Sequence, residues 1–468
     1  MDFKNLIKKK GENEMQLNSK LTRNEEQSGI TLIALVVTIV VLLILAGVTI
    51  NALFGDTGII NRAKDAQNKM DQAAENDLNS LNELNKWLDS KINGTTGGND
   101  DSSTNELPST DDTTPYYPDR TFSKVSRTNL SNGLVIKDSI GNEYVWIEVP
   151  KSLYANSSYN TETTTGDQKP SSSTEYDKIE YCLHKYTDYY RRNSSGTLTS
   201  YTDEYPSNKV DAGTGLTSTQ YTELKQKMLK SVYENGGFWI GRYEAGITTN
   251  RTSKDEEITA APLSKAGTVE NAVYPYTYVT CSQAQTLASQ LSTGKSYTSS
   301  LMYGVQWDLV MKHIEVKEVA KGTALATIQS ALRSDSRDWG NYRDASFTIN
   351  RGKYAKYGAL TTWYNYNTAL ANCVTLENGI SKKVSASPSS NSILLTTGAS
   401  DVCKKMNIYD LAGNVYEWTL EYTANTSRPC ADRGGYGDDG SLTPASYRNY
   451  VSTTSSSINI GFRSSLFK

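Results

Sequence analysis

The sequence predicts an α+β protein, with an N-terminal membrane-spanning helix followed by a large domain of short strands, irregular loops and few helices. Three observations support this prediction. Residues 30–50 are uncharged and apolar, residues 95–121 are rich in Gly, Ser, Thr, Asp and Pro, and short alternating strand patterns begin near Ser123. Such turn-rich segments separate domains, and period-two alternation marks strands.

Composition narrows the class of protein. The chain has 468 residues, 37% of them hydrophobic, and a formal net charge of -3. That length suits two or three domains. Lys and Arg (48) are balanced by Asp and Glu (51), so no basic excess points to nucleic acid as a partner.

The apolar run Ile30–Ile50 is long enough to cross a bilayer as a helix, which takes about 20 residues. A polar leader precedes it and ends at Gly29. A secretory signal peptide would place its small-residue cleavage site after the apolar core. Here the glycine comes before the core.

This order resembles a type IV prepilin, in which prepilin peptidase cuts after the glycine and the new N-terminal residue is methylated. The resemblance implies cleavage between Gly29 and Ile30. The family usually has Phe first and Glu fifth, whereas this chain has Ile30 and Ala34. The missing Glu favours a minor or non-assembling pilin-like anchor over a major pilus subunit, and a plain signal anchor is the alternative.

Four segments follow from these patterns. Apolar residues from Ile59 to Leu88 recur at helical spacing, which predicts an amphipathic stalk. The predicted divisions are a leader at 1–29, a membrane helix and stalk at 30–92, a flexible linker at 93–122, and a C-terminal domain at 123–468. Within that domain, residues 151–235 are rich in polar residues and are predicted to be a surface insertion.

Local patterns place elements in the C-terminal domain. Tyr144–Val149 and Gly237–Glu244 are predicted strands, and Ser282–Leu291 and Tyr303–Ile314 are predicted helices.

Several pieces of this domain, in order, resemble the formylglycine-generating-enzyme (sulfatase-modifying factor) family, whose fold is a variant of the C-type lectin fold. The resemblance spans about 123–468 and is carried by Phe238–Glu244, Gln306-Trp307-Asp308, Asp338-Trp339-Gly340-Asn341, Asn407–Thr419, Arg433-Gly434-Gly435 and Gly461-Phe462-Arg463.

These pieces also have a direct physical interpretation. Gly413-Asn414 supplies the positive φ that a tight turn needs, and the residues after it alternate as a strand. Trp418 and Phe462 are predicted core anchors. Arg433 and Arg463 are predicted to hold loops through bonds to carboxylates or carbonyls.

Catalysis is not expected. In enzymes of this family two cysteines after the Arg-Gly-Gly motif bind copper, yet no Cys follows Gly435 here. Thiolates suit Cu(I), so no copper is expected. The two histidines, His184 and His313, cannot form a three-histidine metal site and are predicted to be ordinary surface or core residues. The chain has five cysteines: Cys182, Cys281, Cys373, Cys403 and Cys430. Because this number is odd, at least one thiol has no intramolecular disulfide partner.

A structural calcium ion is the one cofactor that the resemblance implies. Family members bind calcium near the Gly-Asn motif, and Asn414, Glu417 and the Val415 carbonyl offer the hard oxygen ligands that calcium prefers.

Ligand binding is predicted on the loop-rich stretch Tyr436–Asn459, the face that C-type-lectin-like folds use. Tyr, Asn and Asp are frequent in adaptable binding loops. The predicted ligand-binding residues are Tyr436, Asp438, Asp439, Tyr447, Arg448, Asn449 and Tyr450.

Together these features predict a membrane-anchored, single-pass surface protein whose C-terminal domain lies outside the cell. The expected partner is an extracellular protein or glycan, and the fold also matches variable proteins of diversity-generating retroelements. Two alternatives remain open: a minor pilin or pseudopilin that assembles with other pilins, and a formylglycine-generating-type oxidase.

Overall fold

The computed structural model describes residues 36–37, 106–193, 196–206, 213–357, 359, 361–369, 373–376, 379–382, 392–440 and 443–468, with only the backbone at 373–376 and 379–382. The chain divides into two units, Met1–Leu88 and Asp89–Lys468. Of the first unit only Val36 and Val37 are described, and both are helical. The predicted leader, its processing residues Gly29 and Ile30, and the stalk lie outside the described residues, as does nearly all of the membrane helix. Within the described residues, no helix combines the length and hydropathy needed to span a bilayer.

The second unit is a mixed α/β structure with many short strands and few helices. Its largest sheet is antiparallel in every pairing, and the last strand of the chain lies inside it. The strand order is β1 (Ser123–Lys124), β2 (Val135–Lys137), β3 (Glu143–Glu148), β6 (Gly237–Gly241), β22 (Ser464–Phe467) and β9 (Thr298–Leu301).

A second sheet of four strands carries the sequence motifs of the C-terminal quarter. Its order is β20 (Arg448–Val451), β19 (Cys430–Arg433), β18 (Tyr416–Tyr422) and β21 (Ile460–Phe462). β18 and β21 are parallel, whereas the other pairs are antiparallel. Trp418 and Phe462 lie opposite each other and are buried, which confirms both predicted core anchors.

Smaller sheets complete the strand content. They are β10 (Phe347–Ile349), β14 (Gly379–Lys382) and β13 (Cys373–Leu376); β12 (Trp363–Asn365), β11 (Lys353–Lys356) and β15 (Ile393–Leu395); β16 (Lys404–Lys405) and β17 (Ile408–Tyr409); β4 (Thr161–Glu162) and β5 (Gly166–Asp167); and β7 (Gly246–Ile247) and β8 (Tyr274–Pro275).

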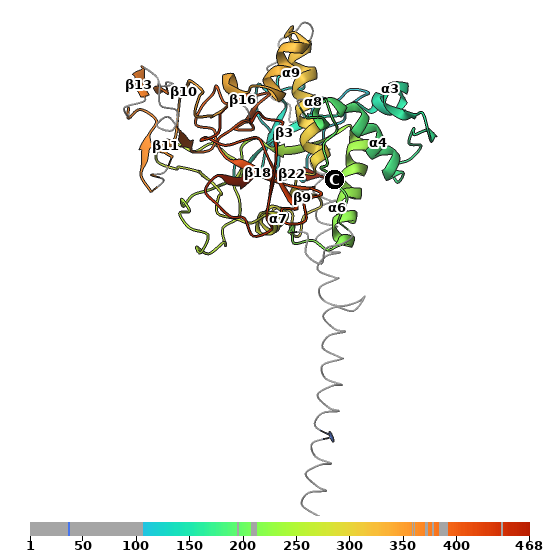
Figure 1. The fold of residues 1–468 in the computed structure, drawn as a ribbon, viewed down its shortest axis with the longest axis horizontal. Coiled ribbons are helices and arrows are strands. Elements are labelled where there is room, and N and C mark those ends of the chain that lie inside the picture. The colour runs from blue at the N-terminus through green and yellow to red at the C-terminus, as the bar shows by residue number, and fades with distance from the viewer. Residues whose placement is uncertain are drawn as a thin grey trace, which may run out of the picture. The chain divides into compact units, whose positions relative to one another are not determined.

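The helices gather mainly on one side of the strands, whereas β10, β11 and β13 lie at the opposite end (Figure 1). The α-helices are α3 (Ser157–Asn160), α4 (Tyr176–Tyr186), α5 (Asp188–Arg191), α6 (Ser218–Asn235), α7 (Cys281–Gln290), α8 (Gly304–Ala320) and α9 (Leu325–Arg333), with 3₁₀ turns η1 (Lys151–Ala155) and η2 (Arg337–Trp339). The predicted strands and helices at 144–149, 237–244, 282–291 and 303–314 are present as β3, β6, α7 and α8. β6 ends earlier than predicted, at Gly241, and α8 continues beyond the predicted end to Ala320.

Helix α6 shows that the segment 151–235, predicted as a surface insertion, does not lie wholly at the surface. Thr217 and Gln220 form a reciprocal capping box at its start, and Gly236 ends it in the left-handed conformation. Its apolar side, including Met228, Leu229 and Val232, is fully buried in the main core. Helix α6 is therefore part of the hydrophobic core of the second unit.

The predicted linker also needs correction at its C-terminal end. Thr113 is fully buried, donates to the Gly236 carbonyl at 2.9 Å and accepts from the Trp146 indole at 2.8 Å. Tyr116 packs edge-on against Trp146. Residues 106–122 therefore pack against the large sheet. Tyr116 and Thr113 of this polar segment both contact the buried Trp146.

The Gly413 turn gives a direct test of close packing. Gly413 has φ 74°, and a Cβ there would lie 2.1 Å from the Asn341 carbonyl oxygen. Gly294 has almost the same φ, 72°, but its Cβ would meet nothing within 4 Å. Gly294→Ala should cost about 1–2 kcal/mol through backbone strain alone. Gly413→Ala should cost clearly more in thermal unfolding, and equal losses would contradict this packing.

Candidate functional site

The Gly-Asn turn joins three parts of the second unit. Gly413 and Asn414 both have positive φ, as predicted. The buried Asn414 Oδ1 accepts from Asn341 Nδ2 and from the Leu395 amide, each at 2.9 Å. Its Nδ2 donates to Glu244. The side-chain oxygen predicted to bind calcium is therefore used by two protein donors.

Glu417 is likewise engaged by protein. Arg463 Nε and Nη2 donate to its two carboxylate oxygens at 2.9 and 2.5 Å. Arg463 also donates to the carbonyls of Gly241 and Tyr409, so it ties three strands together. The predicted role of Arg463 is confirmed, and Glu417 with the buried Val415 belongs to the scaffold.

Two further carboxylates lie at this turn, which sequence reasoning did not single out. Glu244 and Asp410 are buried, and Glu244 Oε2 and Asp410 Oδ1 have no hydrogen-bond partner among the described residues. Burial, and then the charges of Asp410 and Glu417, raise the pKa of Glu244 well above its usual value. Burial raises the pKa of Asp410 to about 7. These orphaned oxygens, more than those of Asn414, are available to a hard cation.

The predicted ligand-binding face contains a cluster of tyrosines. The Tyr416 ring lies 5.4 Å from the Tyr436 ring and 6.4 Å from the Tyr447 ring, and Tyr357 lies 5.6 Å from Tyr436. Tyr436 and Tyr447 are half-buried, and Tyr450 is 44% exposed. These rings present apolar faces together with hydroxyl groups, a combination suited to recognition.

Carboxylates border this cluster. Asp439 accepts from the Tyr416 hydroxyl at 2.6 Å, and Asp438 accepts from Ser392. Asp432 is fully buried in β19, where it lies opposite Asn449 of the neighbouring β20. Burial raises its pKa to about 7, and the nearby Asn449 amide opposes the rise. The face is therefore aromatic and acidic.

Arg448 is the one predicted ligand-binding residue whose role the structure changes. Its side chain is 6% exposed and donates to Asp308 at 2.5 Å and to Glu421 at 2.9 Å. Arg433 binds the same two carboxylates at 3.0 and 3.2 Å. Two arginines and two carboxylates thus alternate in a closed arrangement, which we call the ion ring. Arg448 was misplaced because its partners are distant in sequence.

The histidines and cysteines are mostly interior groups. His313 is buried and its Nδ1 accepts from the Glu148 amide, while burial lowers its pKa to about 3. His184 lies near Glu180 and Asp203, and the three atoms that could bind a metal ion, one from each side chain, lie within 4.8 Å of one another. Lys225 already occupies this cluster, since its ammonium binds Glu180 at 2.9 Å.

The structure also brings Cys430 next to Cys281, although the two are far apart in sequence. Their hydrogen bond, followed by burial, raises the pKa of the Cys281 thiol well above its usual value. Both are fully buried, as are Cys182 and Cys403. Burial makes such thiols poor nucleophiles and poor metal ligands.

Comparisons with known proteins identify no family. The chain has significant sequence similarity to no family model and to no curated protein. Among solved structures, CarF aligns with 49% of this chain and 86% of its own, at 14% identity and a TM-score of 0.28. Treponema denticola variable protein 1 aligns with 50% of this chain and 85% of its own, at 13% identity and a TM-score of 0.27. TM-scores this low do not establish a shared fold.

The ion ring predicts a non-additive effect on stability. Arg448→Leu or Glu421→Leu alone should destabilise the protein by about 3–5 kcal/mol, because each leaves an uncompensated buried charge. The double variant retains the balanced pair of Arg433 and Asp308 and should lose less than the two single losses combined. Denaturant unfolding measures all three.

Arg192 provides the control, since its 2.6 Å pair with Asp188 is solvent-exposed. Arg192→Leu should change stability little. Additive losses at Arg448 and Glu421 would show that the ring is not an energetic unit.

Proposed function

We propose that this chain is a cell-surface binding protein, held in the membrane by its pilin-like N-terminal segment, whose second unit binds an extracellular protein or glycan without catalysing a reaction. Tyr436 and Tyr447, which are half-buried beside the buried Tyr416, carry this proposal. Aromatic side chains that remain partly exposed over a rigid support contribute large contact areas at low entropic cost.

The support beneath the face favours recognition. The ion ring fixes β19 and β20, whose connecting loop bears Tyr436 and Tyr447. Loops on a fixed scaffold can change sequence without loss of the fold. This arrangement suits a variable protein of a diversity-generating retroelement, and it suits a C-type-lectin-like domain of the formylglycine-generating-enzyme type without its chemistry.

Membrane attachment is supported by the sequence of residues 1–50. The glycine that precedes the apolar run makes prepilin peptidase the proposed processing enzyme, with cleavage between Gly29 and Ile30. The mass of the N-terminal peptide from the mature protein decides whether that bond is cut.

We call the surface that bears Tyr436, Tyr447 and Tyr450 the tyrosine face. Its binding can be measured on intact cells that express the full chain. Such cells should adhere to a component of a panel of immobilised mucins, fibronectin, collagen and a glycan array. Tyr436→Ser and Tyr450→Ser should each weaken the adhesion by roughly tenfold or more, since central aromatic residues dominate binding energy.

Ile140→Ser is the matched control, because Ile140 is 63% exposed on the turn between β2 and β3. It should leave adhesion unchanged. Adhesion to no component, or adhesion that the tyrosine variants retain in full, would contradict the proposal.

A structural calcium ion is part of the proposal, with Glu244 and Asp410 as its most available ligands. In calcium-free protein their raised pKa values mean that the folded state holds protons that the unfolded state has released. Stability should therefore fall as the pH rises from about 4 through about 7. Calcium should offset that fall at pH 8, seen as a higher melting temperature than in chelator.

Asp410→Asn should remove the calcium effect. Asp432→Asn should preserve it, although Asp432 is also buried with a raised pKa. A melting temperature at pH 8 that calcium leaves unchanged would rule out this site.

A further inference from the structure

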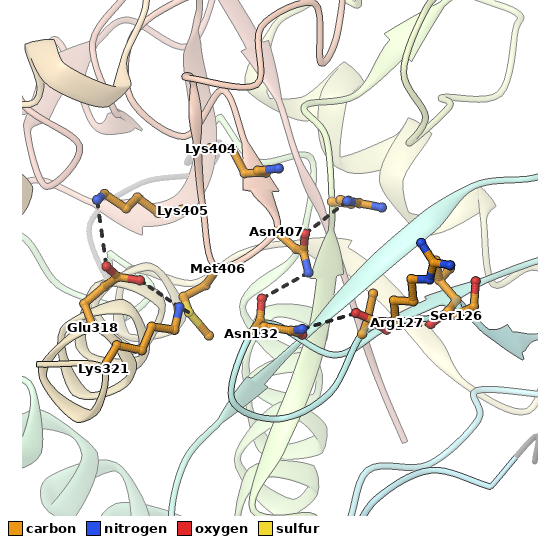
Figure 2. Close-up of a pocket in the computed structure, with 12 residues that line it drawn as sticks. Ser126, Arg127, Asn132, Glu318, Lys321, Lys404, Lys405, Met406 and Asn407 are labelled. Atoms are coloured by element: carbon orange, nitrogen blue, oxygen red, sulfur yellow. Dashed lines mark hydrogen bonds and ion pairs between the residues drawn. The ribbon is translucent and has the colours of Figure 1, made fainter. Parts of the chain in front are cut away.

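A second site lies away from the tyrosine face, in a hollow of about 490 Å³. Four segments form it: the turn between β1 and β2, the residue after β6, the end of α8, and the turn from β16 to β17 (Figure 2). Its lining residues are Val125, Ser126, Arg127, Thr128, Asn132, Arg242, Glu318, Lys321, Lys404, Lys405, Met406 and Asn407. Five of these side chains are cationic and one is a carboxylate.

The one lining carboxylate is already neutralised. Glu318 binds Lys321 at 3.0 Å and Lys405 at 3.9 Å, and Figure 2 shows both lysines turned toward it. The single negative charge of Glu318 is shared by the two positive charges of Lys321 and Lys405, so these three side chains together carry one excess positive charge. The chain as a whole has a formal net charge of -3, which makes this concentration of cations a local feature.

Positive charge is also in excess around Lys404, which shares one carboxylate with Arg351. Lys404 lies 3.8 Å from Asp401, but Arg351 binds the same carboxylate at 2.6 Å. Partial burial, together with the positive charges of Arg242 and Arg351, lowers the pKa of Lys404 despite the opposing effect of Asp401. An anion in the hollow would relieve this repulsion among cations.

Tyr409 lies at the centre of these charges. Lys404, Arg242 and Arg351 lie 5.2, 5.5 and 5.9 Å from the centroid of its ring. Such contacts attract cations to the ring face, yet they add no formal negative charge. Glu143 binds Arg242 at 2.6 Å, and Asp401 binds both Arg351 and Lys404, so these three cations share two carboxylates and one positive charge stays in excess.

The wall itself is built rigidly. Asn407 accepts from Arg242 at 3.1 Å and donates to the Asn132 and Gly133 carbonyls, so it joins the two turns across the floor. Gly133 packs so closely that a Cβ would lie 2.1 Å from the Met406 carbonyl oxygen. The Nε of Arg242 is buried and has no hydrogen-bond partner among the described residues.

Backbone strain gathers at the same place. Arg127, Met406 and Asn407 have φ values of 61°, 48° and 63°, and all three line the hollow. Residues other than glycine rarely adopt this conformation, and such strained residues cluster at ligand sites. This observation does not depend on the charges.

From these observations we propose that the hollow binds a multiply charged oxyanion ligand, one that carries sulfate, phosphate or carboxylate groups. Lys404, Lys405 and Arg242 supply charge-assisted hydrogen bonds to it. Ser126 adds a hydroxyl to the lining of the hollow, whereas the side-chain amides of Asn132 and Asn407 are engaged by the protein. The site is separate from the tyrosine face and does not rest on the function proposed for that face.

Isothermal titration calorimetry of the full chain tests this site at fixed ionic strength. The probes are inorganic sulfate, pyrophosphate and a disulfated disaccharide. We expect saturable binding of a multiply charged probe. In Lys404→Gln/Lys405→Gln that binding should weaken by roughly tenfold or more, because two charge-assisted contacts are lost.

Lys227→Gln/Lys230→Gln is the matched control, since it removes the same charge from the solvent-facing side of α6. It should leave binding intact. Preference for the disaccharide would identify a sugar-borne anion, and equal binding of pyrophosphate would identify a free one. No binding by any probe, or equal weakening in both double variants, would overturn the proposal.

Discussion

The second unit is organised around the ion ring of Asp308, Glu421, Arg433 and Arg448. Each carboxylate accepts from both arginines, and all four side chains are almost fully buried. Isolated ions would lose several kcal/mol each on leaving water, so such groups are tolerated only when every charge is paired with good geometry. The ring meets this requirement by closing on itself.

The ring also fixes the relative positions of four elements. Asp308 comes from α8, Glu421 from β18, Arg433 from β19 and Arg448 from β20. Burial and the neighbouring Arg448 lower the pKa of Arg433, whereas the carboxylates raise the pKa of Arg448 in spite of its burial. Removing any one member would leave the remaining buried charges without balance.

The ion ring anchors both ends of the loop between β19 and β20, and buried residues of that loop, such as Ala445, pack into the core. The chain between β19 and β20 begins at the Arg433 end and returns at Arg448, so both ends of the loop are anchored in the ring. Tyr436 and Tyr447 lie between these anchors. The acidic tyrosine face and the cationic hollow are thus separate surfaces with opposite charge, which suits ligands of different chemistry.

Local sequence patterns predicted much of the scaffold. The Gly413-Asn414 turn, the strand after it and the role of Arg463 each follow from neighbouring residues or from a residue type with few possible functions. The membrane anchor and its processing rest on sequence alone.

The errors have a common physical cause. Arg448 was predicted to face a ligand because an arginine in a polar loop has no local sign of its distant partners, Asp308 and Glu421. Likewise, residues 106–122 have a linker's composition, and only the folded sheet provides burial for Tyr116 and Thr113. The hollow at Lys404 joins four segments, so no single stretch of sequence could reveal it.

Hydrogen exchange on the full chain tests the central claim that the ion ring holds a rigid base under a separate loop. Amides of β18 and β19, paired from Glu417 with Arg433 onward, should exchange only through global unfolding. Amides of the half-buried tip of the loop, 438–440, should exchange much faster by local opening. If β18 and β19 exchange as fast as that loop, the ring does not hold the base and the account is wrong.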